Sequence, residues 1–147
     1  MLKVVVIDGN AISRNLLTSV LLNGGFDVVG DANTSPAGIA GMIKLKPQIV
    51  CIDIGGADDE CLARIDILRG ALPKTLLFLA SGQFDPLTVQ TAVGRGVHGF
   101  IVKPFKAETV LKTIRNAVIK LARQHRQAAA GQDGAAQDDA APVQDES

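Results

Sequence analysis

The sequence predicts an α/β fold in which five parallel strands are covered by helices on both faces. Five short runs rich in β-branched residues alternate with five segments long enough to form helices, and this alternation is typical of parallel sheets with right-handed crossovers. Apolar residues make up 47% of the 147 residues and aromatic residues only 3%. We therefore expect one domain whose core consists of Val, Ile, Leu and Ala, as in strands buried on both faces.

The five predicted strands are apolar runs of four to six residues, a length that suits a strand better than a helix. In chain order they are Lys3–Ile7, Asp27–Gly30, Gln48–Ile52, Thr75–Ala80 and Gly99–Val102.

The first three predicted helices have recognisable start signals. Ala11–Asn23 carries apolar residues at helical spacing, and Asn10 can cap its first turn. Ser35-Pro36 places a proline at the first helical position of a second helix that runs to about Leu45. The third helix, about Asp58–Ala71, opens with three acidic residues that favour the positive end of the helix dipole.

Asp85-Pro86 opens a fourth predicted helix that runs to about Arg95, and the fifth spans about Ala107–Arg123. Residues 124–147 are rich in Ala, Gln and Asp and include one basic and five acidic residues. Such a segment has too few large apolar side chains to offset the entropy of ordering. We therefore expect a folded domain over residues 1–123 and an acidic tail over 124–147 that is mostly disordered, with the last helix running several residues into it.

Three charged side chains stand at the carboxyl ends of strand-like runs. Asp8 follows residues 4–7, Asp53 follows residues 49–52, and Lys103 follows residues 99–102. Open α/β sheets bind ligands at the carboxyl ends of their strands. Two carboxylates and one ammonium that meet there predict a small site for a cation and a phosphoryl group.

The joint spacing of these residues resembles the receiver domain of response regulators, the CheY-like family, over about residues 1–121. Besides the two acids, the resemblance rests on Ser81 at the end of the fourth run and on Lys103-Pro104, which begins 22 residues later. It implies the flavodoxin-like strand order 2-1-3-4-5. It also implies a signalling protein of a two-component system or phosphorelay, a self-phosphorylating acceptor and not a free-standing enzyme. The N-terminal sequence shows no secretory-signal pattern, and no apolar run has the length of a membrane span, so we expect a cytoplasmic protein.

The resemblance assigns a role to each residue of the predicted site. Asp53 would be the phosphoacceptor, taking a phosphoryl group from a histidine on a sensor histidine kinase or a histidine phosphotransfer protein. Mg²⁺ would be held by Asp8, by Asp53 and by the backbone carbonyl of Gly55. Lys103 and Ser81 would contact the phosphoryl oxygens.

The resemblance also implies a switch. Phosphorylation would draw Ser81 inward and let Phe100 change its rotamer, which would repack the surface formed by the fourth helix, fifth strand and fifth helix. The Lys103-Pro104 peptide bond would be cis. We expect the signal to pass to a downstream protein target, and pairing of two copies through helices four and five or through helix one is an expected mode of dimerisation.

Two positions depart from the family pattern. Receivers usually end the first strand with two adjacent acids, whereas Gly9 stands at the second position here, so we expect weak Mg²⁺ binding. Gly55-Gly56-Ala57 replaces a usual Met-Pro turn. These departures leave a second hypothesis open, in which the chain is a pseudo-receiver: a phosphorylation-independent protein-interaction module with a weakened Mg²⁺ site.

Composition argues against several other classes of function. The surplus of four basic residues in 1–123 is too small for a nucleic-acid footprint, and no apolar run approaches the length of a membrane span. Residues 94–99 spell G-x-G-x-x-G, but they follow a helix and precede a strand, the reverse of a dinucleotide site. A flavodoxin-like cofactor binder remains a third hypothesis. Cys51 and Cys61 are expected to be buried free thiols.

Overall fold

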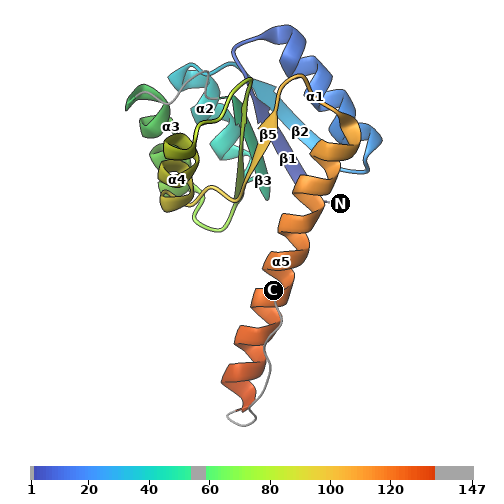
Figure 1. The fold of residues 1–147 in the computed structure, drawn as a ribbon, viewed down its shortest axis with the longest axis vertical. Helices are drawn as coiled ribbons and strands as arrows, with labels where there is room; N and C mark the ends of the chain where they lie inside the picture. Colours follow the sequence, from blue (N-terminus) through green and yellow to red (C-terminus); the bar gives the residue numbers. More distant parts are fainter. Residues whose placement is uncertain (1, 54–58, 135–147) are drawn as a thin grey trace. The chain divides into compact units, whose positions relative to one another are not determined.

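A computed structural model describes residues 2–53 and 59–134 of the chain and confirms the α/β fold (Figure 1). The strands are β1 (Lys3–Ile7), β2 (Asp27–Ala32), β3 (Ile49–Asp53), β4 (Leu76–Ser81) and β5 (Gly99–Val102). The helices are α1 (Ala11–Asn23), α2 (Pro36–Lys44), α3 (Asp59–Ala71), α4 (Pro86–Gly94) and α5 (Ala107–Gly134).

The five strands form one parallel sheet in the order β2-β1-β3-β4-β5, as the resemblance implied. The chain starts in β1, winds outward to β2, and then crosses to the other side of β1 to add β3, β4 and β5. The winding therefore reverses next to β1, and the carboxyl ends of β1 and β3 are adjacent at that point. This is where parallel α/β sheets place their ligands.

The core lies on both faces of the sheet, because alternate residues of each strand point to opposite faces. On one face, strand residues such as Val50, Ile52 and Leu77 form a single buried cluster with side chains from α2, α3 and α4, including Ile39 and Ile65. Figure 1 shows these three helices together on one side of the sheet. This core packs around the strands whose carboxyl ends carry the predicted site residues.

Side chains at the start of three helices accept hydrogen bonds from backbone N–H groups, as expected of N-caps. Asn10 Oδ1 accepts from Ser13 N at 3.0 Å, and Ser35 Oγ accepts from Gly38 N at 3.0 Å. Asp85 Oδ1 accepts from Thr88 N at 2.7 Å, and this bond lowers the pKa of the Asp85 carboxyl. The predicted starts of α1, α2 and α4 are therefore confirmed.

Several strands end later than their composition predicts. β2 runs two residues beyond Gly30, and Asp53 and Ser81 are the last residues of β3 and β4. Each added residue pairs with a neighbouring strand: Asp53 is opposite Ala80, and Ser81 is opposite Val102. Pairing with a neighbour extends a strand through residue types that are uncommon in strands.

The fifth helix differs most from its prediction. α5 continues to Gly134, so residues 124–134, which were assigned to a disordered tail, are helical. Ala, Gln and Arg are strong helix formers, and they dominate this stretch. The chain divides into two compact units, Met1–Ile114 and Arg115–Ser147, and the predicted site lies wholly within the first.

Cys51 and Cys61 are both buried and neither forms a disulfide, as predicted. Burial raises the pKa of the Cys51 thiol to about 12. Within residues 2–53 and 59–134, no helix combines the length and the hydrophobicity that a bilayer crossing requires.

Candidate functional site

The register of the sheet brings Asp8 and Asp53 to the same level. Ile7, the last residue of β1, pairs with Ile52 of β3, so the next residue of each chain segment lies at the same edge. Asp8 is 2% exposed, and Asp53 is half-buried. Two carboxylates from segments 45 positions apart therefore stand at the point where the winding of the sheet reverses.

Lys103 reaches both carboxylates from the far side of β4. Its backbone N–H donates to the carbonyl of Ser81 at 2.9 Å, which continues the pairing of β5 with β4 beyond Val102. The peptide bond to Pro104 is cis. The Nζ atom donates to Asp8 Oδ2 at 3.1 Å and also to Asp53 Oδ2. The three predicted charges thus form one connected cluster.

The electrostatics of this cluster favour a protonated lysine. Partial burial by itself lowers the pKa of Lys103, but hydrogen bonds to Asp53 and Asp8 and the charges of both carboxylates outweigh it, so the pKa lies above its ordinary value of 10.5. The side chains of Lys103 and Asp53 are 20% and 17% exposed. A fixed ammonium beside a partly accessible carboxylate can neutralise an anion that forms there.

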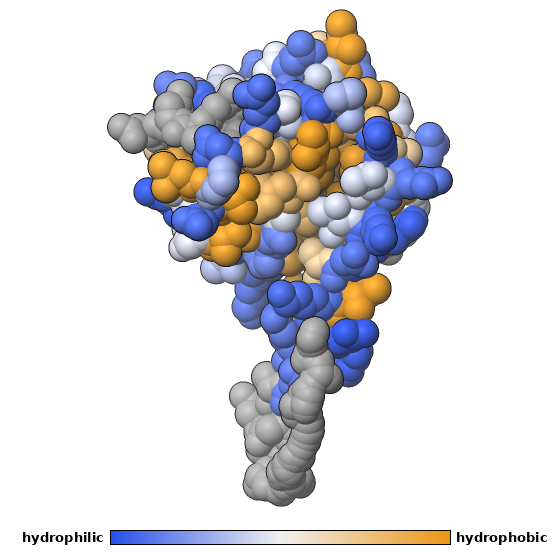
Figure 2. Space-filling model, in the orientation of Figure 1, coloured by the Kyte–Doolittle hydropathy of each residue, from blue (hydrophilic) through white to orange (hydrophobic). Residues whose placement is uncertain are grey.

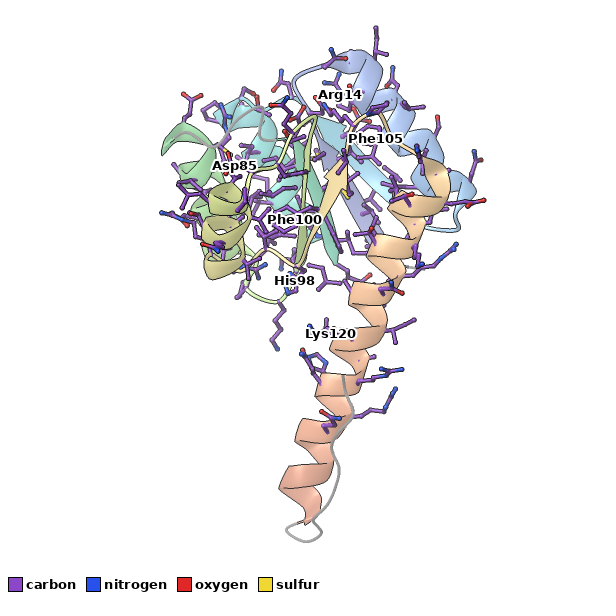
Figure 3. The ribbon with its side chains drawn as sticks, in the orientation of Figure 1. Arg14, Asp85, His98, Phe100, Phe105 and Lys120 are labelled. Carbon is purple, nitrogen blue, oxygen red and sulfur yellow. The ribbon has the colours of Figure 1, made fainter. Side chains whose placement is uncertain are left out.

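Asp8 is held in place by its own loop and by Arg14, a residue that the sequence reasoning missed. The backbone N–H of Asn10 donates to Asp8 Oδ1 at 2.8 Å, and Arg14 Nη1 donates to the Asp8 carbonyl at 2.7 Å. Arg14 Nε also lies 3.1 Å from Asp31 Oδ1 of β2. Figure 3 shows Arg14 at the end of α1 that adjoins the carboxyl edge of the sheet. The sequence signal that could have identified Arg14 is its position in the first turn of α1, shortly after Asp8.

Ser81 ends β4 at the same edge of the sheet, but its hydroxyl forms hydrogen bonds with the backbone of Gln83. Its hydroxyl donates to the Gln83 carbonyl at 3.0 Å, and the Gln83 N–H donates back to Ser81 Oγ at 3.3 Å. Phe100, half-buried on β5 (Figure 3), packs edge-on against Phe84, with ring centroids 5.0 Å apart and an interplanar angle of 72°. Phe84 was not singled out by sequence reasoning, because only the fold brings it beside Phe100.

The donor set fits a hard divalent cation through two carboxylates. Asp8 and Asp53 supply oxygens of the kind that Mg²⁺ prefers, and Mg²⁺ commonly completes its shell with water and phosphate oxygens. Gly55, the third predicted ligand, lies outside the described residues. The described residues hold no cluster of three or more His, Cys, Asp or Glu side chains arranged for a metal.

Gly9 itself leaves room for a side chain. A Cβ atom at this position would meet only Thr34 Oγ1, at 3.7 Å, which is an ordinary van der Waals contact. Packing therefore does not require glycine here, and the missing carboxylate is a chemical feature of the site.

A parallel sheet in this order, with two acids and a lysine at its carboxyl edge, is the arrangement that the resemblance to receiver domains implied. No protein-family profile matches the chain. The chain is 26% identical over 117 residues to the chemotaxis protein CheY of Listeria monocytogenes, an alignment that covers 80% of this chain and 98% of that protein. It is a homologue of CheY-like receiver domains.

Solved structures agree on the fold. Chemotaxis protein CheY4 of Vibrio cholerae superposes with a TM-score of 0.69 at 21% identity and covers 80% of this chain and 98% of its own. The signal receiver domain of a modulated diguanylate cyclase from Desulfovibrio desulfuricans superposes with a TM-score of 0.69 at 23% identity, covering 82% and 95%.

Proposed function

We propose that this chain accepts a phosphoryl group from a phosphohistidine onto Asp53 and signals to a protein partner through a conformational switch. The observation that carries this proposal is the placement of Lys103 Nζ between the carboxylates of Asp8 and Asp53. The partner that supplies the phosphoryl group would be a sensor histidine kinase or a histidine phosphotransfer protein.

The chemistry is a direct phosphoryl transfer. An oxygen of Asp53 attacks phosphorus, the bond between phosphorus and the imidazole nitrogen breaks, and its electron pair stays on the imidazole. The product is an acyl phosphate on Asp53, and the partner's histidine leaves as a neutral imidazole because its other ring nitrogen already carries a proton. When bound, Mg²⁺ would balance charge on the phosphoryl oxygens, held by Asp8 and Asp53.

Lys103 changes partner in this step. Its ammonium donates to Asp53 Oδ2 in the unmodified chain, and once that carboxylate becomes an ester-like group, the nearest anionic oxygens belong to the phosphoryl group. Moving there keeps the charge-assisted hydrogen bond. During this movement Lys103 keeps its hydrogen bond to the carboxylate of Asp8.

The response would proceed through Ser81 and Phe100. Ser81 can supply a hydrogen bond to a new phosphoryl oxygen only if its hydroxyl turns away from Gln83. That movement opens space towards which the Phe100 ring can turn, and it changes the outer surface of β5.

A partner surface lies next to these residues. Leu87 and Val93 of α4 and Val102 of β5 are each more than half exposed, and Figure 2 shows apolar residues gathered over the middle of this face. The end of β5 and the start of α5 border a hollow of about 350 Å³, lined in part by Val102, Lys106 and Thr113. This surface would receive a downstream protein or a second copy of the chain.

The test is incubation of the full chain with a small phosphodonor and Mg²⁺, followed by intact mass spectrometry. The proposal expects a species heavier by one phosphoryl group, about 80 Da, in the wild type and none in Asp53→Asn. Absence of the heavier species in the wild type at millimolar Mg²⁺ would contradict it.

The pseudo-receiver alternative is favoured by one observation, the glycine at position 9. It expects no measurable Mg²⁺ binding and partner binding that is unchanged in Asp53→Asn. A Mg²⁺ titration monitored by NMR of the Asp8 and Asp53 backbone amides separates the two functions.

A further inference from the structure

A second aromatic ring stands between the site and helix α4. Phe84 lies in the loop that joins β4 to α4, and its ring meets the ring of Phe100 edge-on at 5.0 Å. Both rings are half-buried and pack against the core cluster beneath α2, α3 and α4. A shift of either ring therefore requires the other to move or leaves a gap at the edge of the core.

The same loop is tied to Ser81 through its backbone. Gln83, the residue before Phe84, exchanges two hydrogen bonds with Ser81: its carbonyl accepts from Ser81 Oγ, and its N–H donates to that oxygen. Ser81 is 6% exposed whereas Gln83 is exposed, so the two bonds are partly buried. If the Ser81 hydroxyl turns towards Asp53, both bonds break and both Gln83 groups must find new partners.

The loop can respond to that loss. Gly82, between Ser81 and Gln83, has no atom within 4 Å of where a Cβ would lie, so packing does not hold the backbone there. On the other side, Asp85 caps α4 through Thr88 N at 2.7 Å. Phe84 thus lies between a releasable pair of hydrogen bonds and the first turn of α4.

We propose that Phe84 is a positioning residue of the switch: it transmits the movement of Ser81 to Phe100 and to the start of α4. This inference rests on the proposed phosphorylation of Asp53. In the unmodified chain the Ser81–Gln83 bonds hold the loop, and the loop holds Phe84 against Phe100. Release of Gln83 frees the Phe84 ring, and the two rings rearrange as a pair.

The composition of the chain makes the movement measurable. Phe is present at five positions and there is no Trp or Tyr, so uniform labelling with fluorophenylalanine yields a simple ¹⁹F NMR spectrum. Phe84→Leu and Phe100→Leu assign the two signals of interest. Phe26 provides an internal reference, because it is buried and directly precedes β2, at the opposite edge of the sheet from β5.

The expected result is that phosphorylation, scored by intact mass on the same sample, shifts the signals of both Phe84 and Phe100 and leaves the Phe26 signal in place. In Phe84→Leu, phosphoryl uptake is retained while the Phe100 shift falls about fivefold or more. Phe84→Tyr, which keeps the ring, restores it. The matched control Phe26→Leu leaves the Phe100 shift unchanged.

Each contrary result has one meaning. Uptake with a Phe100 shift that is the same in Phe84→Leu as in the wild type overturns the role of Phe84 and leaves the proposed function intact. Phosphoryl uptake that shifts the Phe100 signal but not the Phe84 signal also overturns the role of Phe84 and leaves the proposed function intact. Absence of uptake in the wild type overturns the proposed function and this inference with it.

Discussion

The Nζ atom of Lys103 lies 3.1 Å from Oδ2 of Asp8, although the two residues are 95 positions apart in the chain. The contact exists because β1 and β5 run parallel on opposite sides of β3 and β4, with all carboxyl ends at one edge. Asp8 is almost wholly buried, and a buried carboxylate requires a compensating partner. The ammonium of Lys103 therefore compensates the buried charge of Asp8, in addition to the role that we propose for it at the phosphoryl group.

Replacing Lys103 should destabilise the fold. Lys103→Met removes the cation that faces Asp8 and Asp53, so the free energy of unfolding should fall by about 1–3 kcal/mol. Urea denaturation followed by circular dichroism measures it. Lys112→Met, at an exposed position of α5, is the matched control and should change stability little; equal stability of Lys103→Met and wild type would show that the pairs contribute nothing.

The contribution of Lys103 should depend on pH in a defined direction. Its pKa is raised in the folded chain, so its stabilising effect is fully present below the unfolded-state pKa and is lost as pH rises through the folded-state pKa. The stability difference between wild type and Lys103→Met should therefore stay constant from neutral pH to near 10.5 and shrink above it. Unfolding curves across this range test the sign, and a difference that grows with pH would contradict it.

Gly9→Asp should strengthen cation binding. The new Cβ has room beside Thr34, and a third carboxylate adds a ligand and a negative charge to the site. The dissociation constant for Mg²⁺ should fall about tenfold, or about 1.4 kcal/mol, as measured by calorimetry. Gly9→Ala controls for the added Cβ and should bind Mg²⁺ as the wild type does; if Gly9→Asp matches Gly9→Ala, the missing acid is not what limits affinity.

Cys51 should be inert in the native chain. Its thiol is buried and its pKa is about 12, so almost no thiolate forms at neutral pH. A thiol reagent at pH 7.5 should modify Cys51 only after unfolding, as peptide mapping can show. Rapid modification of Cys51 in the folded chain would mean that the β3 core opens easily.

The fold and the three charges of the site were predictable from the sequence, because both follow from local patterns. Apolar runs indicate strands, and a charged residue after such a run lies at the carboxyl edge of a parallel sheet. Phe84 and Arg14 were not predictable in this way. Their roles depend on where a loop and a helix terminus meet distant residues, Phe100 in one case and the carbonyl of Asp8 in the other.

The extent of α5 shows a different limit. Composition indicated that residues after Arg123 cannot bury enough apolar surface to fold by themselves. The structure continues the helix to Gly134, because a helix that is already nucleated extends through good helix formers without new packing. β3 extends to Asp53 for a similar reason, because Asp53 pairs with Ala80 of the neighbouring strand β4.

The most direct test of the account is to locate the phosphoryl group. After incubation with a phosphodonor and Mg²⁺, borohydride reduction converts a phosphorylated aspartate to homoserine, and peptide mass mapping identifies the position. The account predicts homoserine at position 53 and aspartate at position 8. Homoserine at position 8, or none at either position in a chain that binds Mg²⁺, would contradict it.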